Sequence, residues 1–232
     1  AQKAIIRYVS TNGNRVLTTD EVTGKSGEAI AYSTTSQINE FKKQGYKLVS
    51  DEFTAGGAKV YDYDTARDQV YTVTLSERVE PVNPDNPTPQ PNTPVNPGQP
   101  DSPRWPASVH DLDNKESVSR TIHYVYEDGS KAKDDVVETL NFKRWSRINL
   151  VTGQIFFQDW TTNDDTFDKV VSPTIAGYTA DKSEIPAVSG VQAKDQDRVE
   201  TVTYRKDAQK AVIRYVSTNG NRVLTTDEVT GK

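Results

Sequence analysis

Residues 143–160, which read "KRWSRINLVTGQIFFQDW", combine aromatic rings with cationic and amide side chains. A turn within residues 151–154 predicts a hairpin, and a loop of two or four residues gives the same strand register. In that register Ile148 faces Phe157 and Trp145 faces Trp160, because side chains alternate between the two faces of a strand. The apolar face holds Ile148, Leu150, Ile155 and Phe157, and the candidate ligand-binding residues on the other face are Lys143, Trp145, Arg147, Phe156, Gln158 and Trp160.

This second face has the chemistry of a sugar platform. Aromatic rings stack on the apolar C–H patches of a sugar, while amides and cations hydrogen-bond its hydroxyl groups. Lys143 and Arg147 would meet the acidic group of a sialylated or sulfated glycan, which a net-acidic protein otherwise repels. The competing interpretation is that Trp105 or a loop covers this face. Cross-strand aromatic pairs then only stabilise the sheet, by about 0.2–1 kcal/mol each.

Catalytic and metal-binding patterns are weak in this sequence. The only histidines are His110 and His123, and the chain has no cysteine, so no nucleophile and base stand in a recognisable arrangement. Adjacent carboxylates such as Asp134 and Asp135 point to opposite faces of a strand and do not flank a glycosidic bond. We therefore expect no enzyme and no cofactor. The oxygen-rich residues 163–168 leave a bound calcium ion open, although the EF-hand spacing is absent.

The two ends of the chain carry nearly the same sequence. Residues 1–25 and 208–232 differ only at Ile5 and Val212. The resulting period is longer than the roughly 20–50 residues of solenoid repeats, so we expect a tandem array of whole domains. Residues 208–232 would then be the first hairpin of the next repeat, an incomplete domain.

Proline divides the period into parts. Ten of the twelve prolines lie in residues 81–106. Because proline lacks a donor and fixes φ, we expect residues 81–116 to form a polyproline II linker that does not join a sheet. This gives a first domain at residues 1–80, a second domain at residues 117–207 and the incomplete hairpin at residues 208–232.

The two domains carry similar patterns. "IRYVSTNGN" and "IHYVYEDGS" each run an alternating strand into a hairpin turn, and each domain closes with another strand. The first domain adds a helix at residues 35–44, capped by Thr35 or Ser36, with Ile38 and Phe41 on one face and a stop at Gly45. The second has at most one helical turn, at residues 166–172. We expect an α+β fold of two elongated, mostly-β domains of β-grasp (ubiquitin-like) type.

Composition excludes two kinds of partner. The formal net charge is -5, so nucleic acid is not an expected partner. No segment has the roughly 20 apolar residues that span a bilayer, and no signal peptide is present, so we expect no direct insertion into a membrane.

Three stretches resemble the mucus-binding (Mub) repeats of lactic-acid bacterial surface adhesins. They are "RTIHYVYEDGSKAKDDVVETLNF", "FDKVVSPTIAGYTADKSEIPAVSG" and "TVTYRKD". The resemblance implies an extracellular, non-catalytic repeat on the bacterial cell wall that binds mucin glycans or glycoproteins. Some repeats of this family also bind immunoglobulins. The family has no short binding motif, so the resemblance assigns no site residue.

Two alternatives to mucin binding stay open, an immunoglobulin-binding module and a stalk spacer without its own ligand. The partner of residues 208–232 is a separate question, because a lone hairpin is marginal in water. We expect it to pair with a neighbouring molecule, and packing against the second domain is the second choice.

Overall fold

A computed structural model describes residues 1–231 of the chain. The chain divides into two compact units that are discontinuous in sequence. Unit 1 contains Ala1–Asn114 and Lys143–Asp159, and unit 2 contains Lys115–Phe142 and the residues from Trp160 onward. No helix among the described residues has the length and apolar character needed to cross a bilayer.

Unit 1 is built on a four-stranded sheet with the order β2-β1-β4-β3. Its strands are β1 (Gln2–Ser10), β2 (Val16–Gly24), β3 (Tyr46–Asp51) and β4 (Gln69–Glu77). β1 and β2 form the expected antiparallel hairpin, and β4 runs parallel to β1. Strict alternation in β1 buries Ala4, Ile6 and Tyr8 completely, so this face of the central strands forms the core.

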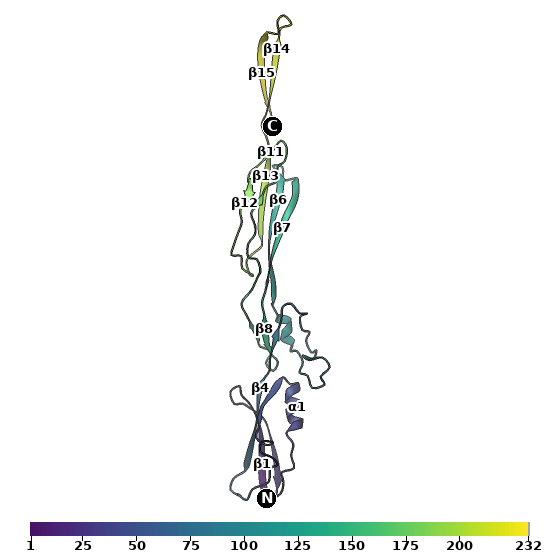
Figure 1. Cartoon of the computed structure of the whole chain (residues 1–232), viewed down its shortest axis with the longest axis vertical. Helices are drawn as coiled ribbons and strands as arrows, with labels where there is room; N and C mark the ends of the chain where they lie inside the picture. The colour runs from purple at the N-terminus through teal and green to yellow at the C-terminus, as the bar shows by residue number, and fades with distance from the viewer. Residues whose placement is uncertain (232) are drawn as a thin grey trace. The chain divides into compact units, whose positions relative to one another are not determined.

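The helix that the apolar periodicity predicted in the first domain is present in unit 1. α1 spans Thr35–Lys43 and buries Ile38 and Phe41 on one face, and it lies beside the sheet in Figure 1. Its N-cap is Thr34, one residue before the expected cap, and no side chain caps it. Gly45 follows the helix with φ of 96°, the left-handed conformation that glycine adopts without strain.

The Pro-rich segment does join a sheet, so the expectation that it could not is wrong. β5 (Val79–Val82) pairs with β8 (Ser146–Asn149), which pairs with β9 (Ile155–Phe157), in the order β5-β8-β9. Pro81 is tolerated because β5 is an edge strand, where one side of the backbone needs no partner.

The rest of the Pro-rich segment belongs to unit 1 as well. It folds back on itself through hydrogen bonds such as Trp105 N to Thr93 O at 3.0 Å, and it ends in the short 3-10 helix η1 (Ala107–Asp111). Val82 and Val109 are buried with Ile148 in a small core. The segment is therefore a folded part of a unit and not a free polyproline II rod.

Unit 2 repeats the strand arrangement of unit 1, as the shared patterns predicted. Its main sheet has the order β11-β13-β6-β7, and β13 runs parallel to β6 as β4 does to β1. The strands are β6 (Lys115–Tyr126), β7 (Lys131–Lys143), β11 (Tyr178–Ala180) and β13 (Arg198–Lys206), with a small pair of β10 (Val170–Val171) and β12 (Glu184–Ile185). The helical turn expected at residues 166–172 is wrong, because β10 lies there.

The largest fully buried side chain of unit 2 is a cation that the sequence pattern did not single out. Arg120 is 1% exposed. Its Nε donates to Glu138 at 2.7 Å, its Nη1 to the Pro186 carbonyl at 3.0 Å and its Nη2 to the Asp168 carbonyl. The guanidinium also lies 5.1 Å from the centre of the Phe167 ring. These contacts tie the β6-β7 hairpin to the irregular segments that cover it.

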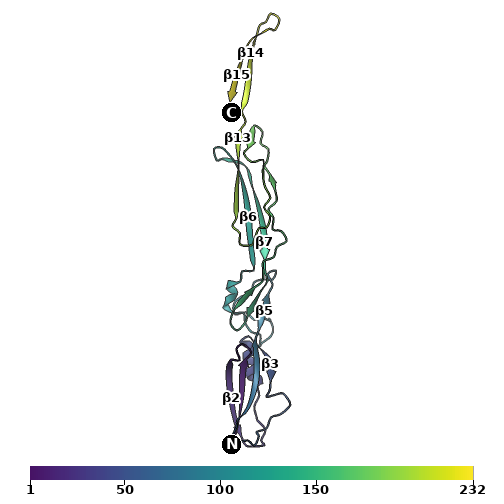
Figure 2. The same ribbon diagram turned by 90° about the vertical axis from the view of Figure 1, so that its left-hand side faces the viewer.

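The last hairpin consists of β14 (Gln209–Val216) and β15 (Val223–Gly231) and forms a sheet of its own. Every residue of both strands is exposed, and Figures 1 and 2 show the two strands, in yellow, paired with each other. The expectation that this hairpin packs against the second domain is therefore wrong. Pairing with a neighbouring molecule stays a prediction.

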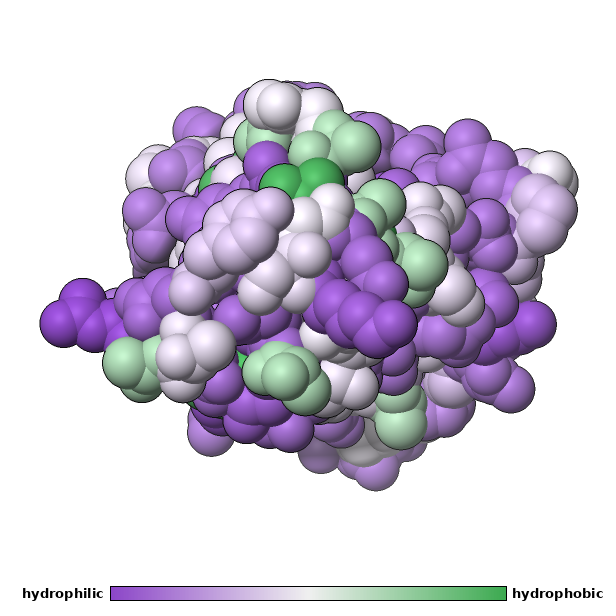
Figure 3. Space-filling view, turned by 90° about the horizontal axis from the view of Figure 1, so that it is seen from below, coloured by the Kyte–Doolittle hydropathy of each residue, from purple (hydrophilic) through white to green (hydrophobic). Residues whose placement is uncertain are grey.

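The end of unit 1 that carries the N-terminus offers no broad apolar surface. In Figure 3 polar residues dominate this end, and apolar residues appear in small, scattered groups. Scattered apolar residues are normal on protein surfaces and do not indicate a docking site.

Candidate functional site

The candidate site lies on the three-stranded sheet β5-β8-β9 of unit 1. Arg147 in the central strand is directly opposite Pro81 on one side and Phe156 on the other. Directly opposed residues share a face, so these three form a row across the sheet about 10 Å long. That length is sufficient for a short oligosaccharide.

The side chains of this row are open to solvent. Phe156 of β9 is 40% exposed, and Arg147 of β8 is exposed as well. Trp145, which lies one residue before β8, is 43% exposed. The Arg147 guanidinium forms no hydrogen bond or ion pair with any residue that the structure describes. We name the surface of Pro81, Trp145, Arg147 and Phe156 the aromatic face.

The opposite face of the same sheet packs on a small core at its central strand. Ile148 is fully buried with Val82 and Val109, and Trp105 and Ile155 pack against them. The interpretation in which Trp105 covers the candidate residues is therefore wrong, because Trp105 covers the face of Ile148. The prediction from side-chain alternation that Ile148 and Arg147 lie on opposite faces of the strand is confirmed.

The strand register differs from the predicted one by two residues. Ile148 pairs with Ile155, and the backbone N–H of Gln158 donates to the backbone carbonyl of Trp145 at 2.9 Å. Trp145 therefore does not face Trp160. The turn starts earlier than expected because the Asn149 side chain accepts hydrogen bonds from the backbone of two turn residues, at 3.0 and 3.1 Å.

Trp160 belongs to a different part of the molecule from the aromatic face. It lies in unit 2, where it packs against the buried cluster that contains Phe142 and Phe167. The Lys194 ammonium is 5.4 Å from the centre of its ring. A ring that is half-buried in this way stabilises a core, so we assign Trp160 a structural role.

Three other expectations for this hairpin are modified by the structure. Lys143 is bound by Asp85, whose two carboxylate oxygens are both 2.9 Å from its Nζ. Gln158 is exposed and opposite Trp145. Phe157, expected in the core, is 39% exposed and lies under the Arg144 guanidinium at 3.9 Å.

One strand of the site, β5, was not predicted from the sequence. Val79 and Pro81 of β5 are exposed on the side of Arg147, and Val79 is 41% exposed. Their position could not be predicted, because the proline content of the segment indicated a linker. A short alternating pattern just before the first proline was the only signal for a strand.

The aromatic face combines flat rings with one unpaired guanidinium. Rings and the proline offer apolar surface for the C–H groups of a sugar, and the guanidinium donates hydrogen bonds in a fixed geometry to hydroxyl or acidic groups. No group of three or more metal-ligating side chains occurs among the described residues, so the stretch at residues 163–168 gains no support as a calcium site.

Comparison with known proteins places the chain in a family. Residues 2–77 match the family described as a mucin binding domain, and residues 109–208 match the Muc B2-like domain. The crystal structure of Mub-RV is 26% identical, with a TM-score of 0.70 over 89% of this chain and 100% of that chain. This chain belongs to the mucus-binding (Mub) repeat family.

A second Mub structure agrees with this assignment. The type 2 repeat of the mucus binding protein MUB from Lactobacillus reuteri is 28% identical, with a TM-score of 0.57 over 89% of this chain and 100% of that chain. No curated protein matches the chain. The similarity to both Mub repeats spans the two units, so the division of this chain into two mostly-β units agrees with the family.

Proposed function

We propose that this Mub repeat binds mucin glycans through the aromatic face, as a non-catalytic adhesion module on the bacterial cell surface. The observation that carries the proposal is the exposed pair of Arg147 and Phe156 on a sheet whose other face packs on a small core at its central strand. The stability of the fold does not require an aromatic ring on the solvent-exposed face of a small sheet. The family assignment supports mucin as the partner, and the exposed rings support this surface as the proposed site for its sugars.

The strand order supports a further interpretation of the scaffold. In each unit a hairpin is followed by a strand parallel to its first strand, and unit 1 places a helix between them. We infer that both units are β-grasp modules, the second without the helix. The three-stranded sheet is an addition to the first module.

Adjacent phenylalanines allow a matched test of the aromatic face. Phe156 and Phe157 are equally exposed, at 40% and 39%, but point to opposite faces of the sheet. Phe156→Ala should weaken binding to immobilised mucin about tenfold in surface plasmon resonance, because loss of a ring that stacks on a sugar costs roughly 1–2 kcal/mol. Phe157→Ala should leave binding within about twofold.

Two further measurements complete this test. Arg147→Gln should weaken binding to mucin, and more for native than for desialylated mucin if the guanidinium meets an acidic sugar. The mucin surface should be dense, because a single repeat lacks the avidity of an array. Unchanged binding by Phe156→Ala, with the fold intact by circular dichroism, would remove the aromatic face from the site.

A further inference from the structure

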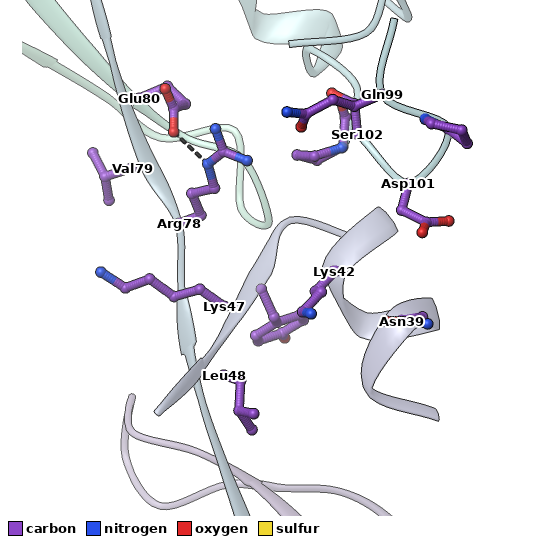
Figure 4. A pocket seen from close by; sticks show the side chains of 13 residues that line it. Asn39, Lys42, Lys47, Leu48, Arg78, Val79, Glu80, Gln99, Asp101 and Ser102 are labelled. Atoms are coloured by element: carbon purple, nitrogen blue, oxygen red, sulfur yellow. Dashed lines mark hydrogen bonds and ion pairs between the residues drawn. The ribbon is translucent and has the colours of Figure 1, made fainter. Parts of the chain in front are cut away.

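A groove of about 810 Å³ lies within unit 1, beside the aromatic face. Figure 4 shows α1 and β3 on one side of it, the start of β5 on another, and the Pro-rich loop at residues 99–103 opposite β5. Its volume lies in the range of roughly 300–1,000 Å³ that is typical of small-molecule sites. The groove does not belong to the aromatic face, but the exposed Val79 side chain lines it and lies on the strand that also carries Pro81.

Positive charge gathers in this groove although the chain is net negative. Lys42, Lys47 and Arg78 line it, against Glu80 and Asp101. The Arg78 Nε donates to Glu80, as the dashed line in Figure 4 marks, so these two charges offset each other.

The remaining cations have no partner of their own. Within residues 1–231, the side-chain ammonium groups of Lys42 and Lys47 form no hydrogen bond or ion pair. The one remaining carboxylate, Asp101, is 3.9 Å from Lys43, which is bound to Glu40 at 2.9 Å. Two ammonium groups therefore face an open groove without a carboxylate to neutralise them.

The groove also offers apolar and amide surface. Leu48 is 40% exposed and Val79 41% exposed, and both line it. Gln99 contributes a side-chain amide from the loop, across from Arg78 in Figure 4. A ligand that fits carries one negative group for the lysines, C–H surface for the aliphatic side chains and hydroxyl groups for the amide.

We propose that this groove binds an acidic sugar, through the negative group of a sulfate ester or a carboxylate. The proposal rests on the proposed function, because mucin is then the source of the sugar. It adds a second site to the repeat, in which Lys42 and Lys47 contact the negative group and Leu48 and Val79 contact the ring. Sugar binding at the aromatic face does not need this groove.

The test uses the full chain, labelled with nitrogen-15, in NMR titrations at low salt. The probes are sulfated N-acetylglucosamine, N-acetylneuraminic acid and neutral N-acetylglucosamine. We expect at least one acidic sugar to shift the signals of Lys42, Lys47 and Arg78, and the neutral sugar to leave them in place. A shift with only the sulfated or only the carboxylated probe supports the proposal and identifies the acidic group.

Charge-matched variants separate a built site from general attraction. Lys42→Gln combined with Lys47→Gln should weaken binding of the acidic sugar about tenfold, because two charge-assisted contacts are lost. The control combines Lys115→Gln with Lys133→Gln, which removes the same charge from exposed positions of unit 2. Equal weakening in both double variants would overturn the proposal, as would equal shifts with the neutral sugar.

Two further outcomes test the sugar assignment and the independence of the groove from the aromatic face. If a peptide of glutamate and aspartate binds the groove more tightly than either acidic sugar, the sugar assignment is wrong. Phe156→Ala should weaken mucin binding about tenfold but leave the groove titration unchanged. If Phe156→Ala weakens mucin binding and leaves the groove shifts unchanged, both sites are supported. If Phe156→Ala leaves mucin binding unchanged and the acidic sugar still shifts the groove signals, only the proposed function is overturned.

Discussion

Inside unit 1, two tyrosines and a carboxylate form a hydrogen-bonded chain. The Tyr8 and Tyr32 hydroxyls are 2.9 Å apart, and Tyr32 donates to the Asp20 carboxylate. Burial raises the pKa of Tyr32 strongly, and the hydrogen bond to Asp20 raises it further, because an ionised Tyr32 would lose its donor beside a negative charge. Burial also raises the pKa of Tyr8. Both side chains therefore hold their protons in the folded state.

This network predicts a loss of stability at alkaline pH. Because the folded pKa values are raised, the stabilisation is fully present below the unfolded pKa of about 10 and is lost as pH rises above it. Urea unfolding of the chain should give a free energy of unfolding for unit 1 that is constant from about pH 8 to 9.5 and falls at higher pH, by at most about 1.4 kcal/mol per pH unit for each tyrosine.

Substitution of one tyrosine separates the network from general alkaline unfolding. Tyr32→Phe should reduce the slope above about pH 10, whereas Tyr63→Phe, at a position that is 80% exposed, should not. If both variants kept the slope of the parent chain, the network would have no part in the alkaline transition.

Single residues also show what the sequence can and cannot predict about the site. The separation of Ile148 from Arg147 followed from alternation alone, because the period of a strand is fixed by its backbone. The register did not, because it depends on the Asn149 side chain, which binds backbone amides of the turn and also donates to Glu77 at 2.6 Å. Tertiary contacts of this kind leave no periodic signal in a sequence.

At the scale of elements, the repeated hairpin separates local from tertiary information. β1-β2 and β14-β15 have equivalent registers, Gln2 with Gly24 and Gln209 with Gly231, and the same irregularity at the bulge. Their burial differs completely, because Tyr8 is fully buried and its equivalent Tyr215 is 47% exposed. Pairing and register are therefore encoded in the hairpin itself, and burial depends on the elements that follow it.

The two hairpins should differ in hydrogen exchange. Exchange of an amide in a lone hairpin needs only local opening, whereas exchange in β1 requires opening of the unit 1 core. We expect amides at residues 210–215 to exchange at least about a hundredfold faster than amides at the equivalent residues 3–8. NMR-detected exchange of the full chain measures both sets in one sample. Equal protection would show that another surface covers β14-β15 in solution.

At the scale of the whole molecule, the chain passes between its units three times, after Asn114, Phe142 and Asp159. The sequence suggested domains in simple succession, because composition changes most at the prolines. The three-stranded sheet instead joins residues 79–82 to residues 146–157. A contact between segments so far apart cannot be inferred from composition. It places the aromatic face on strands that no single contiguous domain supplies.

The exposed inner face of β14 predicts how two copies of the chain interact. Ile213 and Tyr215 are each 47% exposed, and their equivalents Ile6 and Tyr8 are fully buried in unit 1, where Ile38 and Phe41 of α1 belong to the same core. A second copy therefore contains the surface that fits this hairpin, once its own β1-β2 hairpin has left.

Such an exchange gains little energy, because the two hairpins differ only at Ile5 and Val212. It should be slow, and it should appear mainly when chains refold together at high concentration. We expect the chain refolded from urea at high concentration to contain a dimer fraction in analytical ultracentrifugation, and a variant that lacks residues 208–232 to be monomeric. Ile213→Asp should abolish the dimer, since a buried unpaired carboxylate is costly. Arg214→Asp changes the opposite face of the same strand and should retain it. A dimer that survives Ile213→Asp, or a chain that stays monomeric after concentrated refolding, would rule out this exchange.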